Sequence, residues 1–223
     1  MTQHPSLTTA TSPPACSTPP GHPKPQHQPA RPKSHEATQT IHIRTTASPT
    51  HAGPIAHLGA QVFTATFGHS VTPAELSAYL DSAYTIPHIA ADLAHPDKTT
   101  IIATSTGKNG EQHQHLLGFA LLTRNSNRAE PSVAHLDPGE CIELQRLYVA
   151  GGAQGRGVGS LLVGEAERMA RAEGRKHVWL GVWEENWGAQ RAYARWGFER
   201  VGEHGFSVGG VVQVDWVMVK GLA

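Results

Sequence analysis

The chain has 223 residues, in which 18 lysines and arginines balance 18 aspartates and glutamates. This balance argues against the strongly positive surface of proteins that bind nucleic acid or anionic membranes. No apolar run approaches the roughly 18 residues of a membrane-spanning helix, the first residues lack the apolar stretch of a signal peptide, and two cysteines are too few for a disulfide framework. We therefore expect a soluble, cytoplasmic protein that binds neither nucleic acid nor a membrane.

Histidine is abundant, with 15 residues in the chain. These histidines are scattered singly and form neither an HExxH helix nor a Cys/His spacing typical of zinc sites. We therefore expect no metal site.

The first 40 residues differ in composition from the rest. They contain nine of the 16 prolines, no aromatic residue, and only Met1 and Leu7 as large apolar side chains. Such a Pro/Ser/Thr-rich segment cannot bury enough apolar surface to offset the entropy of ordering. The segment has a single arginine and no amphipathic pattern, so we expect a disordered tail at 1–40 and not an organelle transit peptide. The remaining residues, 41–223, have the length of one domain.

Hydrophobic periodicity predicts strands and helices in mixed order. In chain order we expect a strand at 41–46, helices at 55–67, 73–84 and 86–93, strands at 99–105, 115–123 and 141–149, a helix ending near 173, a strand at 177–183, a helix at 187–196 and two final strands. Thr72 and Pro73 give the second helix an N-cap followed by proline, and Asn109-Gly110 marks a hairpin turn. This order predicts an α/β domain with a mixed sheet flanked by helices.

The turn QGRGVGS at 154–160 lies between a predicted strand and a predicted helix. Its three glycines allow backbone N–H groups to approach a ligand closely, and the following helix start adds partial positive charge and unpaired donors. Arg156 adds a full charge within the turn. The spacing therefore favours a site for a phosphate or diphosphate.

Other interpretations of this turn are weaker or remain open. A P-loop requires Lys and Ser/Thr after its last glycine, whereas Val158 follows Gly157. A dinucleotide fingerprint requires glycine or alanine where Ser160 stands. A glycine-rich connection without a ligand remains the alternative for the turn taken alone.

Two motifs in this order resemble the GNAT superfamily of N-acetyltransferases. LYVAGGAQGRGVGSLL carries a Q-x-x-G-x-G pattern at Gln154, Gly157 and Gly159, and the segment 182–198 carries N-x-x-A-x-x-x-Y followed by Gly-Phe. The segments 63–80, 182–198 and 212–220 more narrowly resemble the spermidine/spermine N-acetyltransferase branch. The resemblance implies acetyl-CoA as cosubstrate and a sheet that splays between the strands 141–149 and 177–183.

The resemblance also implies roles for particular residues. The backbone of the strand before the turn would bind the pantetheine arm, the turn would bind the diphosphate, Asn186 and Ala189 would contact the cofactor, and Tyr193 would give a proton to the departing thiolate. The implied cofactor residues are Leu147, Tyr148, Val149, Gln154, Gly155, Arg156, Gly157, Val158, Gly159, Ser160, Asn186 and Ala189.

The acceptor amine must lose a proton before it can attack, because an alkylamine is mostly ammonium at neutral pH. Glu143 is our candidate base, since strand alternation would place Glu143, Gln145, Leu147 and Val149 on one face. A solvated carboxylate with a water relay is an equal alternative. Glu184 and Glu185 either attract a polycation or lie in a solvated loop, and Trp183 is either packing or a pocket wall.

We therefore expect an N-acetyltransferase that acts on a small primary amine, with a polyamine as the best named acceptor. A protein or peptide N-acetyltransferase and an acyl-CoA-binding sensor without turnover are the alternatives. The sequence leaves open whether the protein forms a homodimer.

Overall fold

The computed structural model describes residues 40–106, 115–208 and 211–222. All of them belong to one unit, Ala37–Ala223. The tail expected at 1–40 lies almost wholly outside the described residues, as does the turn expected at Asn109-Gly110.

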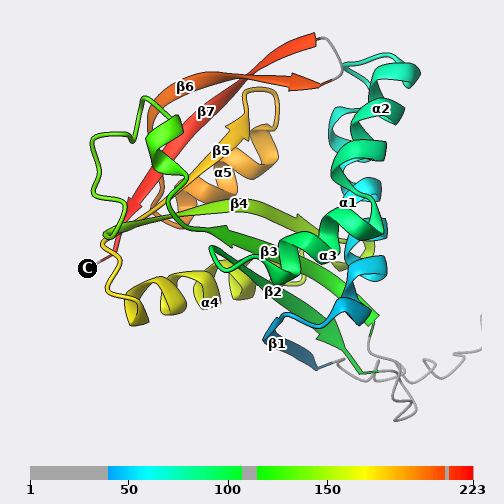
Figure 1. Cartoon of the computed structure of the whole chain (residues 1–223), viewed down its shortest axis with the longest axis horizontal. Coiled ribbons are helices and arrows are strands. Elements are labelled where there is room, and N and C mark those ends of the chain that lie inside the picture. Colours follow the sequence, from blue (N-terminus) through cyan, green and yellow to red (C-terminus); the bar gives the residue numbers. More distant parts are fainter. Residues whose placement is uncertain (1–39, 107–114, 209–210, 223) are drawn as a thin grey trace, which may run out of the picture. The chain divides into compact units, whose positions relative to one another are not determined.

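Among the described residues, seven strands form one sheet in the order β1-β2-β3-β4-β5-β7-β6 (Figure 1). The strands are β1 Ile41–Thr46, β2 Lys98–Ser105, β3 His115–Thr123, β4 Cys141–Val149, β5 His177–Trp183, β6 Glu199–Val208 and β7 Val211–Gly221. Neighbouring strands are antiparallel except β4 and β5, which run parallel. The mixed sheet predicted from the sequence is confirmed.

In the part of the chain that the structure describes, five α-helices accompany the sheet: α1 Ala52–Phe67, α2 Pro73–Ala83, α3 Ile86–Ala94, α4 Val158–Ala172 and α5 Trp187–Arg195. The cap predicted for the second helix is present, because the Thr72 side chain accepts a hydrogen bond from the Glu75 amide and the Glu75 carboxylate accepts one from the Thr72 amide. Within the described ranges, none of the helices has the length and apolar character needed to cross a bilayer.

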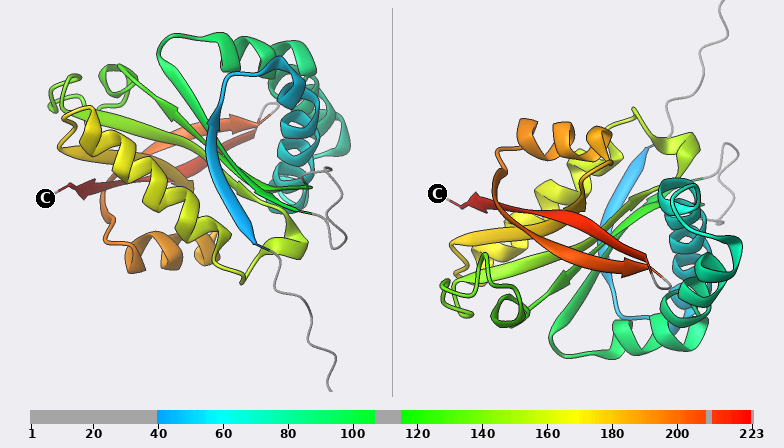
Figure 2. Two further views of the ribbon diagram at one scale, coloured as in Figure 1. Left: turned by 90° about the horizontal axis from the view of Figure 1, so that it is seen from below. Right: turned by 90° about the horizontal axis from the view of Figure 1, so that it is seen from above.

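The helices cover both faces of the sheet (Figure 2). Residues of α4 and α5 form a core with the inward side chains of β2–β5, centred on fully buried residues such as Leu122, Leu162 and Leu180. Residues of α1 and α3 form a second core on the other face, which includes Phe63 and Phe119. The strand β4 contributes to both cores, through Leu144 on one face and Tyr148 on the other.

The strands β4 and β5 pair over only three residues each. Cys141, Ile142 and Glu143 pair with His177, Val178 and Trp179. Beyond Glu143 the two strands diverge, so the peptide groups on that side of β4 are not bonded to β5. The splay predicted between these strands is confirmed.

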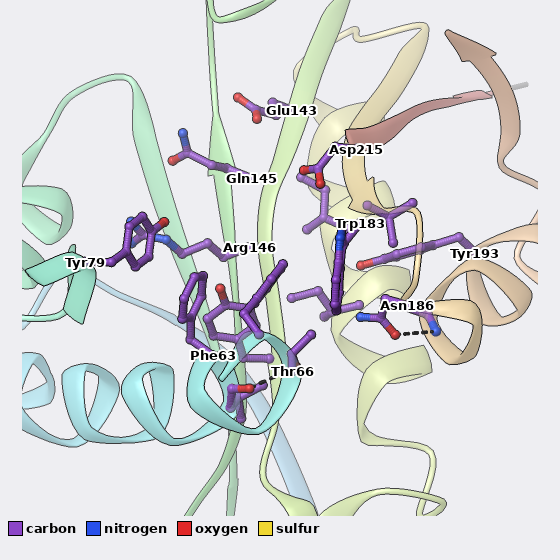
Figure 3. Close-up of a pocket in the computed structure, with 18 of the residues that line it drawn as sticks. Phe63, Thr66, Tyr79, Glu143, Gln145, Arg146, Trp183, Asn186, Tyr193 and Asp215 are labelled. Atoms are coloured by element: carbon purple, nitrogen blue, oxygen red, sulfur yellow. Dashed lines mark hydrogen bonds between the residues drawn. The ribbon is translucent and has the colours of Figure 1, made fainter. Parts of the chain in front are cut away.

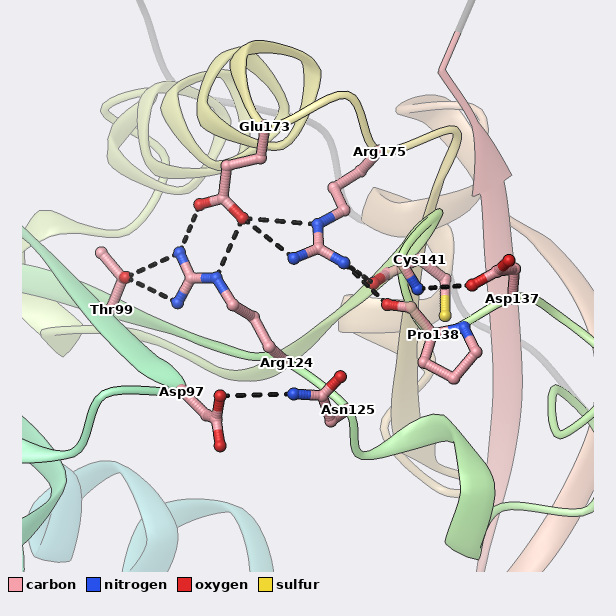
Figure 4. A network of polar contacts seen from close by, with 10 residues as sticks. Asp97, Thr99, Arg124, Asn125, Asp137, Pro138, Cys141, Glu173 and Arg175 are labelled. Atoms are coloured by element: carbon pink, nitrogen blue, oxygen red, sulfur yellow. Dashed lines mark hydrogen bonds and ion pairs between the residues drawn. The ribbon is translucent and has the colours of Figure 1, made fainter.

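A polar clamp holds the closed end of the splay (Figure 4). Arg124, directly after β3, makes a two-pronged ion pair with Glu173 at the end of α4 and also donates to the Thr99 hydroxyl. Arg175 donates to the Glu173 carboxylate and, at 2.7 Å, to the carbonyl of Pro138 before β4. These contacts tie α4 to β2, β3 and β4 at the end opposite the glycine turn.

A β-bulge at Gln145 changes which face the residues of β4 occupy. Leu121 of β3 pairs with Arg146 and Leu122 pairs with Leu144, which leaves Gln145 as the extra residue. Leu144 and Leu147 consequently pack in the same core although they are three residues apart. The prediction that Glu143, Gln145, Leu147 and Val149 share one face is therefore wrong.

Candidate active site

The glycine turn leads directly into the start of α4. Gly155 and Gly157 have φ values of 72° and 81°, in the left-handed region that favours glycine. Gly157 is the N-cap of α4 and no side chain caps this end. The first N–H groups of α4 therefore face outward from the turn with their partial positive charge uncompensated, which is the arrangement that binds anions.

Gly159 has a different function. A Cβ atom at this position would lie 3.3 Å from the Trp196 ring, which follows α5. The absence of a side chain thus permits the close approach between the start of α4 and the end of α5.

A cavity of about 570 Å³, which we call the turn cavity, lies along the glycine turn. It is lined by β4, the turn, α4, α5 and two residues of α1, Val62 and Thr66. Ten of the predicted cofactor residues line it: Leu147, Val149, Gln154, Gly155, Gly157, Val158, Gly159, Ser160, Asn186 and Ala189. Arg156 is exposed beside this cavity without lining it, and Tyr148 faces the other side of β4.

The loop between β5 and α5 is fixed by two polar side chains. The Asn186 side chain caps α5 by accepting a hydrogen bond of 3.2 Å from the Ala189 amide. The buried Gln190 amide donates to the carbonyls of Trp183 and Glu184 at 2.9 and 2.8 Å. Together they set the direction of α5 and thereby the position of Tyr193.

Tyr193 is buried and packs edge-to-face against Trp196 and Phe198, each with a ring centroid 5.7 Å away. Its hydroxyl makes no hydrogen bond to another residue of the described chain and points toward Trp183 (Figure 3). Burial, with a further contribution from Tyr148, raises the pKa of Tyr193 above its ordinary value. The hydroxyl therefore carries its proton at neutral pH.

A second cavity of about 320 Å³, the sheet cavity, adjoins the first at the splay (Figure 3). Six residues line both cavities: Val62, Thr66, Leu147, Asn186, Ala189 and Tyr193. The sheet cavity also has an aromatic wall, in which Trp183 packs against Phe67 at 4.9 Å between ring centroids. Trp183 is thus a pocket wall, whereas Trp179 packs in a separate cluster with Val133 and Val217.

Two carboxylates line the sheet cavity, Glu143 of β4 and Asp215 of β7. Burial raises the pKa of Asp215 to about 6, although the neighbouring His204 lowers it in part. Burial also raises the pKa of Glu143, against the effect of nearby polar and cationic groups. Glu184 and Glu185, by contrast, are exposed and line neither cavity, which agrees with the solvated-loop alternative.

The guanidinium of Arg146 also lines the sheet cavity. It donates a hydrogen bond of 2.9 Å to Asp92, whose carboxylate also receives Lys98 at 2.5 Å. The guanidinium lies 5.4 Å from the ring centroid of Tyr84, and the Tyr84 and Tyr148 hydroxyls are 2.6 Å apart. This network makes the floor of the cavity polar and holds it in one arrangement.

Sequence reasoning missed Asp215, Arg146 and the α1 residues of both cavities. Asp215 did carry a signal, since it is an acidic residue within the apolar alternation of VQVDWVMVK. The α1 residues carried none, because apolar side chains on a helix face indicate packing as readily as a pocket.

Known proteins are similar to this chain in sequence and in fold. Residues 65–198 match the Acetyltransferase (GNAT) family. An uncharacterised N-acetyltransferase of Mycobacterium tuberculosis is 28% identical over 173 residues, which cover 78% of this chain and 99% of that protein. Phosphinothricin N-acetyltransferase of Streptomyces coelicolor is 36% identical over 93 residues, 42% of this chain and 50% of that protein.

A similar fold occurs in the crystal structure of PaiA N-acetyltransferase of Thermoplasma acidophilum in complex with coenzyme A, with a TM-score of 0.62 and 18% identity over 82% of this chain and 99% of that chain. Arabidopsis thaliana NAA60 in complex with a bisubstrate analogue gives a TM-score of 0.65 and 16% identity over 82% of this chain and 100% of that chain. The family match covers more than half of the sequence and includes the glycine turn and Tyr193. The chain therefore belongs to the GNAT family of acetyltransferases, enzymes whose cosubstrate is acetyl-CoA.

Proposed function

We propose that this protein transfers the acetyl group of acetyl-CoA to the primary amine of a small cationic acceptor, and that a polyamine is the first acceptor to test. One observation carries the proposal: the turn cavity and the sheet cavity share a wall that includes Tyr193. A thioester held in the first cavity and an amine held in the second would meet beside a buried, protonated hydroxyl.

The turn cavity offers each part of coenzyme A a matching surface. The N–H groups at the start of α4 suit the diphosphate. Beyond Glu143 the edge of β4 is not paired with β5. Its peptide groups can therefore form hydrogen bonds with the amide-bearing pantetheine arm, as they would with an added strand. A backbone N–H in the segment Leu147–Val149 would then polarise the thioester carbonyl, a role that requires no particular side chain.

The reaction requires the two reactants in contact, stabilisation of charge on the carbonyl oxygen, and proton transfer from nitrogen to sulfur. The amine nitrogen attacks the thioester carbon, and the C–S bond then breaks with its electron pair on sulfur. Tyr193 supplies the proton to this thiolate, since its raised pKa keeps it protonated until the thiolate forms.

The acceptor class is proposed from the charge of the sheet cavity. Glu143 and Asp215 provide two carboxylates, and Trp183 provides an aromatic wall suited to an ammonium group. The sequence likeness to the spermidine/spermine N-acetyltransferase branch supports the same class. A polyamine, with several ammonium groups on an apolar chain, matches both features.

A second acceptor class has a specific observation in its favour. Arg146 lines the same cavity, whereas its partner Asp92 does not, so the guanidinium could also receive a carboxylate of the acceptor. An amino acid would use the two carboxylates and Arg146 together. The relative named phosphinothricin N-acetyltransferase makes that compound a useful member of the test panel.

The test combines binding and turnover. Calorimetry with acetyl-CoA measures the cofactor, and thiol release measures turnover with spermidine, putrescine, glutamate, phosphinothricin, an aminoglycoside and a lysine-containing peptide. We expect binding of acetyl-CoA and the fastest turnover with spermidine. Turnover with the peptide alone would indicate a protein N-acetyltransferase, and binding without turnover would indicate a sensor. No binding would overturn the proposal.

A further inference from the structure

Glu143 and Asp215 do not lie at the same level of the sheet. Glu143 pairs with Trp179 of β5, whereas Asp215 pairs with Trp183, four residues further along the same strand. At the usual rise of a β-strand this separation is about 13 Å along β5. Asp215 is thus at the open end of the splay, and the close-up shows it on the Tyr193 side of Glu143 (Figure 3).

The fold makes room for the Asp215 carboxylate. A Cβ atom on Gly181 would lie 3.2 Å from Asp215 Oδ2, so glycine leaves the carboxylate unobstructed above β5. Asp215 Oδ1 is buried and makes no hydrogen bond to any residue that the structure describes. A buried acceptor without a donor is destabilising and calls for an explanation, of which a catalytic role is one.

His204 lies next to Asp215 on the adjacent strand, since the two residues pair across β6 and β7. The Nδ1 atom of His204 is 2.8 Å from Glu130 Oε2, without the alignment of a hydrogen bond, and its side chain is 32% exposed. A partly exposed ring thus lies beside the Asp215 carboxylate and lowers its pKa.

Resting on the proposed function, we propose that Asp215, and not Glu143, is the base that takes the proton from the acceptor's ammonium group. The carboxylate accepts one proton from R–NH₃⁺, which leaves R–NH₂ with a free lone pair. After attack on the thioester, Tyr193 protonates the coenzyme A thiolate, and the resulting tyrosinate takes the surplus proton from nitrogen. Asp215 returns its proton to water past His204, so each turnover releases one proton.

The charge state of Asp215 depends on the groups that face the sheet cavity. These are His204 of β6, Glu143, Arg146 and Tyr148 of β4, Tyr79 of α2, Tyr84 after α2, and Tyr193 of α5. Burial and the neighbouring His204 set the pKa of Asp215 at about 6. A base with this pKa is mostly ionised at neutral pH and still accepts a proton readily.

The pH dependence of kcat/KM separates the two carboxylates. For spermidine, or the fastest amine of the panel, wild-type kcat/KM should rise with pH through about 6 and then level off, because only ionised Asp215 is a base. Asp215→Asn should lower kcat/KM at pH 7 by about 100-fold or more and should lose this plateau. Its activity should instead keep rising toward the pKa of a free alkylamine, about 10.4, as solvent deprotonates the acceptor.

Matched variants complete the test. Glu143→Gln should keep the acidic limb near pH 6, although the loss of one cavity carboxylate should lower the level of kcat/KM for a cationic acceptor. His204→Asn should move the acidic limb to higher pH, because the ring that lowers the pKa of Asp215 is gone. Asp215→Asn should melt no lower than wild type and bind acetyl-CoA normally, which excludes misfolding.

Two results would overturn the inference. One is an Asp215→Asn profile that matches wild type within about threefold, and the other is loss of the acidic limb in Glu143→Gln instead. Failure of the wild-type protein to bind acetyl-CoA is a different result, because it would refute the proposed function and with it the role of Asp215.

Discussion

Replacing Tyr193 with phenylalanine should separate catalysis from stability more cleanly than any other change in this site. The substitution removes only the hydroxyl, and the edge-to-face contacts of the ring with Trp196 and Phe198 remain. Because the hydroxyl bonds to no described residue, the free energy of unfolding should change by less than about 1 kcal/mol. Loss of a general acid should lower kcat by about 10²- to 10⁴-fold, or about 3–5 kcal/mol in activation free energy.

Tyr148→Phe is the matched control. The Tyr148 hydroxyl bonds to Tyr84 and lines only the sheet cavity, so its removal should cost about 1–3 kcal/mol of stability with a small effect on kcat. The assays are thiol release under saturating acetyl-CoA, calorimetry of acetyl-CoA binding, and thermal unfolding. A Tyr193→Phe enzyme with kcat within about threefold of wild type and unchanged cofactor affinity would remove Tyr193 from the chemistry.

Three further changes test the cofactor turn and its supports. Gly157→Ala should weaken acetyl-CoA binding about tenfold in calorimetry, because its φ of 81° strains any side chain, whereas Gly152→Ala nearby should have little effect. Gly118→Ala should destabilise the protein by about 1–3 kcal/mol in denaturant, because its Cβ would lie 2.6 Å from a carbonyl of β4. Asp92→Asn should lower the free energy of unfolding by about 3–5 kcal/mol at pH 7, because Arg146 loses its charged partner. When the pH is taken below about 4, the wild-type protein should lose stability, because the Asp92 carboxylate with its lowered pKa becomes protonated, and the variant should lose less.

Features that depend on neighbouring residues in the chain could be predicted from the sequence. The strands Cys141–Val149 and His177–Trp183 coincide with their predicted ranges, because each is an apolar run bounded by turn residues. The glycine turn could be predicted in the same way, because the preceding strand, the glycines and the helix start are contiguous in the sequence.

Features that depend on strand register could not be predicted. The bulge at Gln145 is defined by how β3 pairs with β4, and nothing in the residues of β4 alone marks it. For the same reason Glu143 was assigned to the wrong face relative to Leu147. Asp215 was missed because β7 inserts between β5 and β6, a sheet order that brings residue 215 beside Trp183.

The residues proposed to bind acetyl-CoA lie inside the region that matches the family, whereas several residues of the acceptor cavity lie outside it. The matched region, 65–198, contains the glycine turn, Asn186 and Tyr193, which are the parts proposed to bind and use acetyl-CoA. Phe63 lies before this region, and His204 and Asp215 lie after it, yet all three line the sheet cavity. Substitutions of Phe63, His204 or Asp215 can therefore change the acceptor and leave the lining of the turn cavity intact. A relative that matches this chain only over 65–198 can thus share Glu143 and Trp183 of the acceptor cavity but not Asp215 and His204, so the acceptor depends on residues outside the matched region as well as inside it.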